Sequence, residues 1–327
     1  MRAVLCNEFG EPETLTMGDA PDVEPDKGEV QVAVAAAGVN FADILMVAGK
    51  YQEKPPFPFS PGLEVAGTVM KSGNGVRGFK KGDQVMAATS KGGFAEQLVV
   101  PASDVFRIPK SLSFEDAAGF AVVYGTAYGA LNWRAQLQAG ETLLVLGAAG
   151  GVGLTAVEVG KAMGATVIAA ANGPERTALA AEHGADHLID YSTENLRERV
   201  RDITEGNGCD VIFDPVGGQA FDVALRCTAW EGRLIVIGFA SGTIPQAPAN
   251  ILLVKNCGVL GFYWGAYRRR EPERFKAAFK DLFKWFEKGT LKPHVSQTFP
   301  LEQAGEALRI LADRKAKGKI VLTTGNG

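Results

Sequence analysis

Short apolar runs alternate with helical patterns between residues 142 and about 263, and this alternation constrains the fold most. Each run is apolar on consecutive residues, which is typical of strands whose two faces are both covered by helices. The region therefore predicts a doubly wound α/β fold with a parallel sheet. The predicted strands are TLLVLG (142–147), TVIAAA (166–171), HLIDY (187–191), DVIFD (210–214), RLIVIG (233–238) and GVLGFYW (258–264).

The first 120 residues have a different pattern. Glycine and proline recur every several residues, and the apolar segments EVQVAVAAAG (29–38) and EVAGTVMKSG (64–73) lie between turn signals. Such spacing favours a compact, mostly antiparallel β domain.

An amphipathic helix and one more strand follow the parallel sheet. The helix has Pro272 in its first turn and Gly289 at its end, and its apolar face consists of Phe275, Phe279, Leu282, Phe283 and Phe286. The segment GKIVLTTG (318–325) is predicted to be a strand that returns to the first domain. We therefore predict a β domain over 1–122 that 266–327 completes, and a parallel-sheet domain over 123–265.

Composition excludes several classes of protein. The chain of 327 residues has a formal net charge of -3, without the excess of positive charge expected of a nucleic-acid-binding protein. No apolar run is long enough to span a bilayer, and the amino terminus lacks the apolar region of a signal peptide. Scattered cysteines indicate buried thiols in a reducing compartment, so we expect a cytoplasmic protein; they are Cys6, Cys209, Cys227 and Cys257.

The first strand of the parallel sheet runs directly into AAGGVG (148–153) and then into a helical pattern. Strand, glycine loop and helix in this order predict a Rossmann dinucleotide site, in which the N–H groups at the helix start bind the pyrophosphate. Gly150 would let the backbone approach the pyrophosphate, and Gly153 would let the helix pack on the strand. Ala148 stands where the usual pattern has its first glycine, and the expected cofactor contacts are Ala149, Gly150, Gly151, Val152 and Gly153.

The end of the second strand predicts which dinucleotide binds. An NAD site places Asp or Glu there to accept the ribose 2'-hydroxyl, but this chain has Ala170, Ala171 and Asn172, with Arg176 four residues beyond. A guanidinium without a competing carboxylate favours the 2'-phosphate of NADPH. The alternative is that Arg176 is a solvated residue on the first turn of a helix, partly cancelled by Glu175.

Seven motifs give the chain a resemblance to a known family. It resembles the medium-chain dehydrogenase/reductase superfamily, and within it the zinc-free, zeta-crystallin-like NADPH:quinone oxidoreductases. The resemblance covers essentially the whole chain and implies a GroES-like catalytic β domain beside the Rossmann domain; one departure is Glu158, where the family usually has Gln. The motifs are GVNFADI (38–44), PFSPGLEVAGTV (58–69), GDQVMA (82–87), VVYGTAY (122–128), GETLLVLGAAGGVG (140–153), DPVGG (214–218) and GKIVL (318–322).

The zinc ligands of the related zinc enzymes are missing. Asn40 and Leu63 stand where the zinc branch carries its Cys and His, and residues 90–110, where its four-cysteine lobe would lie, contain no Cys. His183 and His187 have the spacing of a helical metal pair, but a helix end is predicted between them, so we expect no metal. Without a Lewis acid, the site suits acceptors already activated by conjugation.

The resemblance places Asn40, Asp43 and Tyr51 in the cleft that faces the nicotinamide, and Thr126 near the nicotinamide ring. The Asn40 amide could donate a hydrogen bond to a carbonyl oxygen, and the Tyr51 hydroxyl could donate to the same oxygen or relay a proton. Asp43 would orient neighbouring groups. The alternative is that these residues bond local backbone in turns.

Further contacts of the cofactor and the acceptor are expected. Tyr191, Phe239 and Lys319 are expected to contact the cofactor. Some quinone reductases of the family have a second Tyr where this chain has Leu45, so the pocket would be more apolar. Tyr263 and Trp264 would give a flat acceptor an aromatic wall, unless they are core or dimer-contact residues.

The expected activity is hydride transfer from C4 of NADPH to a quinone or similar conjugated carbonyl, with the developing oxyanion held by Asn40 and Tyr51. An enone, alkenal or enoyl-thioester reductase is the close alternative, and Arg268–Arg270 would then pair with phosphates of coenzyme A unless it is a solvated turn. An NADPH-binding protein with a structural or nucleic-acid-binding role is a third hypothesis.

The apolar edge strand GVLGFYW predicts a homodimer, as in relatives.

Overall fold

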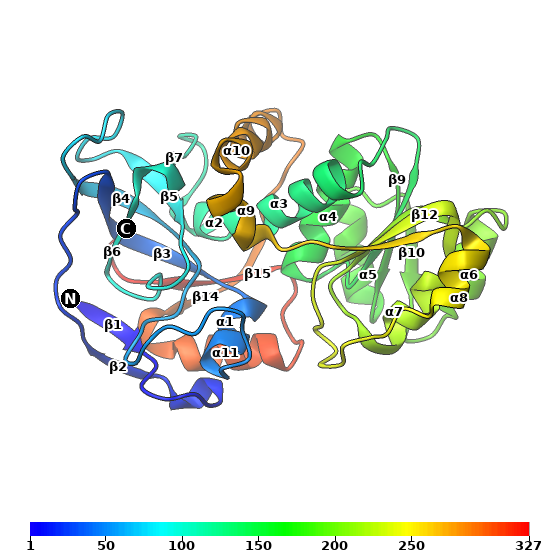
Figure 1. The fold of residues 1–327 in the computed structure, drawn as a ribbon, viewed down its shortest axis with the longest axis horizontal. Helices are drawn as coiled ribbons and strands as arrows, with labels where there is room; N and C mark the ends of the chain where they lie inside the picture. Colours follow the sequence, from blue (N-terminus) through cyan, green and yellow to red (C-terminus); the bar gives the residue numbers. More distant parts are fainter. Residues whose placement is uncertain (327) are drawn as a thin grey trace. The chain divides into compact units, whose positions relative to one another are not determined.

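The computed structural model describes residues 1–326 and divides the chain into two compact units (Figure 1). The β unit contains Met1–Val122, Arg268–Phe283 and the chain from Pro293 onward. The α/β unit contains Val123–Tyr267 and Lys284–Lys292.

The α/β unit is built on a six-stranded parallel sheet with the order β10-β9-β8-β11-β12-β13. The order reverses at β8, where strands of opposite crossover direction meet, and ligands of such sheets bind at the carboxyl ends of the strands there. The parallel sheet predicted from the sequence is therefore confirmed. Its strands are β8 (Thr142–Leu146), β9 (Thr166–Ala171), β10 (His187–Asp190), β11 (Cys209–Asp214), β12 (Thr228–Val236) and β13 (Gly258–Gly261).

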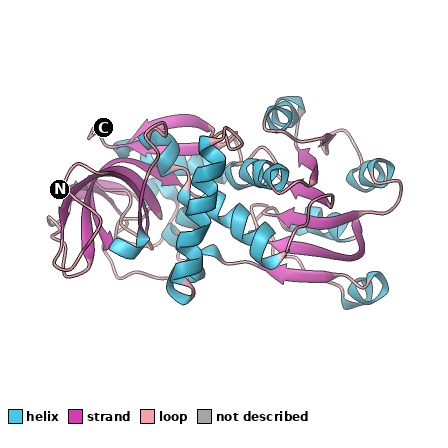
Figure 2. Ribbon diagram, turned by 90° about the horizontal axis from the view of Figure 1, so that it is seen from above, coloured by secondary structure: helices cyan, strands magenta, loops and turns pink. Residues whose placement is uncertain are grey.

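Helices lie on either side of these strands (Figure 2), which explains the continuous apolar runs. The side chains of Leu143, Leu144 and Val145 on β8 are all completely buried. The helices are α3 (Ala121–Tyr128), α4 (Gly151–Ala162), α5 (Pro174–Glu182), α6 (Leu196–Ile203), α7 (Gly218–Leu225), α8 (Ala249–Lys255) and α9 (Trp264–Arg270), with a π-helical segment η3 over Gly129–Arg134.

The last strand of this sheet is shorter than predicted. We expected a strand over residues 258–264, but β13 ends at Gly261 and Trp264 begins α9. The reason is packing: Phe262 and Trp264 are both buried, each against a glycine of the segment formed by α3 and η3. Phe262 and Trp264 are two positions apart, the spacing of two residues that share one face of a strand, so apolar character alone did not reveal where the strand stops.

The β unit is built on a mostly antiparallel sheet with the order β14-β15-β3-β4-β5-β7, in which β6 also pairs with β3. The carboxyl-terminal strand β15 pairs with β3, which confirms the predicted return to the first part of the chain. The strands are β3 (Glu29–Val39), β4 (Glu64–Ser72), β5 (Gln84–Ala88), β6 (Gln97–Pro101), β7 (Val105–Arg107), β14 (Val295–Pro300) and β15 (Lys319–Thr323), with a separate pair β1 (Arg2–Leu5) and β2 (Thr16–Asp19).

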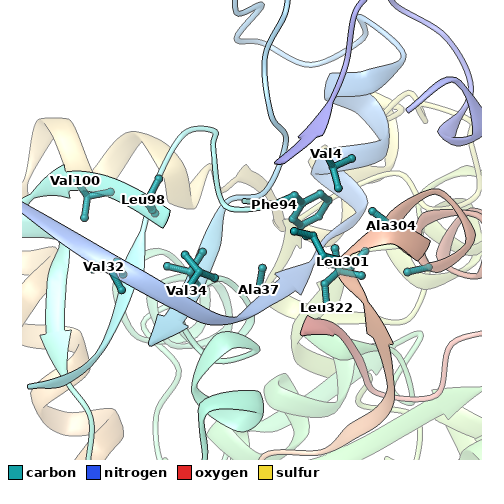
Figure 3. Packing of buried hydrophobic residues seen from close by; sticks show 14 of the residues in the cluster. Val4, Val32, Val34, Ala37, Phe94, Leu98, Val100, Leu301, Ala304 and Leu322 are labelled. Carbon is teal, nitrogen blue, oxygen red and sulfur yellow. The ribbon is translucent and has the colours of Figure 1, made fainter. Parts of the chain in front are cut away.

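Aliphatic side chains from β3, β6 and β15 form the core of this unit (Figure 3). Val32 lies opposite Leu98 in the sheet, and Val34 and Leu322 are completely buried beside them. The helical elements packed around the sheet are α1 (Phe41–Val47), α2 (Phe114–Ala118), α10 (Pro272–Glu287) and α11 (Ala304–Ala312), with three 3-10 turns, η1 (Pro12–Thr14), η2 (Ala102–Asp104) and η4 (Leu301–Gln303).

Candidate active site

A glycine loop joins β8 to α4 in the α/β unit. Gly147 has a φ of 59°, a left-handed conformation that favours glycine, and turns the chain after the strand. A Cβ atom at Gly153 would lie 2.2 Å from the carbonyl oxygen of Gly147, so only glycine lets α4 pack this closely. At Gly150 the same distance would be 3.4 Å, an ordinary contact.

Backbone N–H groups at the start of α4 form the anion-binding part of this loop. Gly151, Val152 and Gly153 belong to the first helical turn, whose N–H groups have no acceptor within the helix. The N–H of Ala148 donates to Ala170 over 3.1 Å and thereby fixes the loop to β9, while Ala149 is buried. The loop can therefore hold a pyrophosphate by backbone donors and the helix dipole.

The turn after β9 carries the residues predicted to contact the adenosine ribose. Asn172 is exposed, Gly173 has a φ of 96°, and Arg176 lies half-buried on the first turn of α5. The helix α5 ends at Glu182, as expected from Gly184, so His183 and His187 do not share a helical face.

Asp190 is a carboxylate at this turn that the sequence did not reveal. Its Oδ1 accepts the N–H of Gly173 over 2.8 Å and the N–H of Ser192 over 3.0 Å. The hydrogen bond from the Ser192 hydroxyl, followed by the one from Gly173, lowers the pKa of Asp190. Tyr191 follows it and is 37% exposed. Asp190 reaches this turn because β10 pairs with β9 in parallel, so the carboxyl ends of the two strands are neighbours.

The two residues predicted to form an aromatic wall, Tyr263 and Trp264, differ in burial. Trp264 is buried against α3, where a Cβ atom at Gly125 would lie 2.2 Å from its ring, whereas Tyr263 is 37% exposed. Thr126, the next residue on α3, is 8% exposed. Trp264 is therefore a core residue that fixes α3, in a cluster with Phe262, Trp133, Tyr128, Tyr267 and Trp285.

Phe239 lies in the segment that follows β12. Its ring packs against the turn after β11, since a Cβ atom at Gly217 would lie 3.0 Å from Phe239 Cδ1. That turn is fixed by Asp214, whose Oδ1 accepts N–H groups of Val216 and Gly217 over 2.7 and 2.9 Å. Phe239 is thus at the carboxyl ends of the central strands, where the dinucleotide loop also lies.

In the β unit, Asn40, Glu64 and Lys319 form a buried polar cluster. Lys319 Nζ lies 2.7 Å from Glu64 Oε1 and donates to Asn40 Oδ1 over 2.6 Å and to the carbonyl oxygen of Val39 over 2.9 Å. The Asn40 amide nitrogen donates to Glu64 over 2.9 Å and to Gly38 over 3.2 Å. Both hydrogens of the Asn40 amide and all three of the Lys319 ammonium are therefore engaged inside the unit.

Two glycines make room for this cluster. A Cβ atom at Gly38 would lie 2.6 Å from Glu64 Oε1, and one at Gly119 would lie 2.7 Å from Lys319 Cγ. The second Glu64 oxygen accepts the N–H of Val122 over 2.8 Å. Burial of a charged pair is tolerated because every donor and acceptor in it has a partner.

Asp43 lies at the start of α1 and is completely buried. Its carboxylate accepts the N–H of Asn40 over 2.8 Å and the N–H of Gly62 over 3.1 Å, which fixes α1 to the segment before β4. Burial raises the pKa of Asp43 to about 7, although the two N–H donors and the Lys319 ammonium act in the opposite direction. Asp43 therefore bonds two backbone N–H groups, one at each end of the link between α1 and the segment before β4.

Tyr51 and Leu45 lie at the carboxyl-terminal end of α1. The N–H of Tyr51 donates to the carbonyl oxygen of Leu45 over 3.0 Å, and both side chains are half-buried. Tyr51 packs against an apolar cluster that contains Leu63 together with Cys6, Met46, Val47 and Phe59. Tyr51 therefore lies beyond the last residue of α1, Val47, whereas Asn40 is at the start of that helix.

The arginine run differs from the solvated turn that we considered. It forms the last turn of α9, and Arg268 is half-buried. Arg268 lies 3.3 Å from Asp104 and donates to the carbonyl oxygen of Ala88, and Arg269 lies 2.7 Å from Glu53. Arg268 is thus paired inside the β unit, whereas Arg269 and Arg270 are exposed.

Comparison with known proteins identifies the family. Residues 26–110 match the family described as alcohol dehydrogenase GroES-like domain, and residues 151–284 match the one described as zinc-binding dehydrogenase. The quinone oxidoreductase-like protein 2 homolog of Nematostella vectensis is 45% identical over 99% of this chain and 89% of the relative. This chain belongs to the quinone oxidoreductase-like family.

Other quinone oxidoreductases share both sequence and fold with this family member. The quinone oxidoreductase of Pseudomonas aeruginosa is 36% identical over 96% of this chain and 97% of the relative. The crystal structure of Escherichia coli quinone oxidoreductase complexed with NADPH has a TM-score of 0.92 and 30% identity, covering 99% of this chain and 100% of that one. The chain is accordingly an oxidoreductase of the medium-chain type.

Potential metal ligands were compared over the part of the chain that the structure describes. Within residues 1–326, no group of three or more His, Cys, Asp or Glu side chains is arranged to hold a metal ion. The two positions that the sequence resemblance compared with zinc ligands hold Asn40, which bonds Lys319 and Glu64, and Leu63, which lies in an apolar cluster. Over the same residues, no helix is long and apolar enough to cross a membrane.

Proposed function

We propose that this oxidoreductase transfers a hydride from C4 of NADPH to a quinone or a similar conjugated carbonyl compound, without zinc. The observation that carries the proposal is the loop of residues 147–153. Backbone N–H donors lie there at the start of α4, and only glycine at position 153 can pack so close to Gly147. This loop fits the pyrophosphate of a dinucleotide. The bound cofactor would supply the hydride.

NADPH is the proposed cofactor because Arg176 lies beside the turn where the adenosine ribose is held in such folds. The nearby Asp190 carboxylate is engaged by the N–H groups of Gly173 and Ser192, so it has fewer lone pairs for a ribose hydroxyl. The NADPH complex of the Escherichia coli relative supports the same choice. Asn172, Tyr191 and Phe239 remain proposed contacts of the cofactor.

The absence of zinc is supported by what surrounds Asn40. Its amide is held between the Lys319 ammonium and the Glu64 carboxylate, and an amide is a poor replacement for the thiolate that binds zinc in relatives. Without a Lewis acid to polarise an isolated carbonyl, the acceptor must stabilise negative charge itself. Quinones and enones do so by conjugation.

Residues in and next to α1 are proposed to bind the acceptor and to stabilise its negative charge. We propose that Asn40 and Asp43 act by positioning, because their polar atoms bond each other, Gly62, Glu64 and Lys319. The Tyr51 hydroxyl is the proposed donor to the developing oxyanion, and Leu45 contributes an apolar surface. The ammonium of Lys319 contributes positive charge to the site through the cluster rather than by direct cofactor contact.

A homodimer formed through β13 is proposed as the assembly. This strand is at the edge of the parallel sheet, and a second copy would continue the sheet across a two-fold axis. Val259 packs against the core of its own unit, whereas Leu260 is half-buried outside that cluster. A charge at Leu260 should therefore weaken the dimer. Sedimentation of the unmodified protein as a monomer at micromolar concentration would exclude the proposed dimer.

The four free cysteines support a cytoplasmic location.

Turnover with a panel of acceptors tests the proposal. NADPH oxidation would be followed with quinones, enones, enoyl-coenzyme A esters and saturated ketones, after removal of metal with a chelator. We expect quinones or enones to react and saturated ketones not to react. Preference for enoyl esters would assign the enzyme to double-bond reduction, and tight NADPH binding without turnover on any acceptor would leave only a binding role.

A further inference from the structure

Glu158 is a buried carboxylate that neither the dinucleotide loop nor the acceptor site uses. It lies on α4, the helix that begins at the loop, and is 2% exposed. Its Oε2 accepts the hydroxyl of Tyr124 over 2.6 Å, and its Oε1 accepts the N–H of Lys292 over 3.0 Å. His183 Nδ1 lies 2.6 Å from the same Oε1.

The Tyr124 hydrogen bond joins α4 to α3. A second bond lies one turn earlier on the same face of α4, where the Thr155 hydroxyl donates to the carbonyl oxygen of Val123 over 3.1 Å. Two consecutive residues of α3 are thus held by two residues of α4. The ring of Trp264 also packs against α3, at Gly125.

This arrangement sets the position of Thr126 relative to the pyrophosphate loop. Thr126 is two residues beyond Tyr124 on α3, and Gly151 to Gly153 form the first turn of α4. If α3 and α4 are held rigidly together, Thr126 and the pyrophosphate loop keep a fixed separation. The nicotinamide end and the phosphate end of a bound dinucleotide would then each contact a fixed part of the protein. Small displacements of such partners lower the rate of hydride transfer more than they lower affinity.

We propose that Glu158 is a positioning residue for hydride transfer, acting through Tyr124 on the helix that carries Thr126. The inference rests on the proposed function, because it assigns Thr126 to the nicotinamide. A carboxylate suits the task because three donors from three separate segments, Tyr124, His183 and Lys292, meet at two acceptor oxygens. Gln at this position can keep most of these contacts, since its amide can donate to the Tyr124 oxygen, whereas an apolar side chain keeps none.

The test compares Tyr124→Phe, Glu158→Gln and Glu158→Leu. We expect Tyr124→Phe to lower kcat about tenfold while the Kd of NADPH changes less than about twofold, because the loop itself is unchanged. Glu158→Leu should lower kcat at least as much, and Glu158→Gln should restore most of it. The matched control is Thr228→Val, which removes a buried hydroxyl that donates to Leu225 over 2.6 Å, far along the chain from α3.

Hydrogen exchange without cofactor provides a readout that does not depend on catalysis. Peptides that cover residues 121–128 should exchange faster in Tyr124→Phe than in the unmodified protein, and at the unmodified rate in Thr228→Val. Unchanged exchange of α3 in Tyr124→Phe would overturn the inference even if activity fell. Faster exchange with an unchanged kcat would also overturn it, and an unmodified protein that oxidises no NADPH would instead reject the proposed function.

Discussion

The two units arrange their polar groups in opposite ways. In the β unit, Asn40, Glu64 and Lys319 are buried side chains that bond one another, with every donor engaged. In the α/β unit, the loop of residues 147–153 has small residues and presents backbone donors at a helix start. The β unit therefore holds a closed cluster of side chains, whereas the α/β unit holds backbone donors that can bind an anion.

This difference teaches how each centre responds to substitution. Where buried side chains bond one another, a substitution of one lowers the stability of the fold, because it leaves the others buried and unpaired. A backbone site has no functional side chain to remove, so only an added atom can disturb it. We therefore expect stability effects from the cluster and binding effects from the loop.

The largest expected effect is on the buried ion pair. Lys319→Met should lower the free energy of unfolding by about 3–5 kcal/mol, because Glu64 is left as an unpaired buried charge. The double variant Glu64→Leu with Lys319→Met should recover most of this loss. Urea unfolding measures both, and equal losses in single and double variants would show that the pair is not coupled.

Two alanine substitutions in the loop separate packing from binding. Gly153→Ala forces a Cβ atom to within 2.2 Å of the Gly147 oxygen, and should lower stability by ~1–3 kcal/mol as well as weaken NADPH binding. Gly150→Ala makes only an ordinary contact, so it should keep stability and weaken binding about tenfold. Thermal unfolding and cofactor titration would check the pair. Equal melting temperatures for the two variants would contradict the geometry of the loop.

Arg176→Ala tests whether the binding site discriminates between cofactors. We expect NADPH affinity to fall about ten- to a hundred-fold and NADH affinity to stay nearly constant, since a charge-assisted contact is worth about 1.5–3 kcal/mol. The control is Arg201→Ala on α6, a well-exposed arginine 3.6 Å from Asp202. Equal losses for both cofactors would show that Arg176 does not bind the 2'-phosphate.

The smallest effect is the loss of stability that Asp43 causes in the β unit between pH 6 and pH 7. Because burial raises the folded-state pKa of Asp43 to about 7 from 3.8, the folded state binds more protons than the unfolded chain between these values. Its contribution to stability is therefore full below about pH 4 and is lost as the pH rises toward 7, at about 1 kcal/mol per pH unit. Compared with Asp43→Asn, the unmodified protein should lose stability from pH 6 to pH 7. Parallel stability curves for the two would contradict the raised pKa.

Much of the fold followed from the sequence because its signals are local. The strand, glycine loop and helix of the cofactor site occupy consecutive residues, and the apolar runs of β8 and β9 are buried on both faces. The Lys319 contacts were not predictable, because its partners Asn40 and Glu64 are far away in the sequence. Sequence spacing likewise gave no sign that Glu158 meets Tyr124 and His183, or that Asp190 lies beside Gly173.

A single turnover measures the central claim most directly. The purified protein would be treated with chelator, analysed for zinc, loaded with one equivalent of NADPH and mixed with a quinone in a stopped-flow instrument. We expect the absorbance of NADPH to disappear completely and at the same rate before and after zinc is added. Oxidation that begins only after zinc is supplied, in proportion to the zinc bound, would contradict the account.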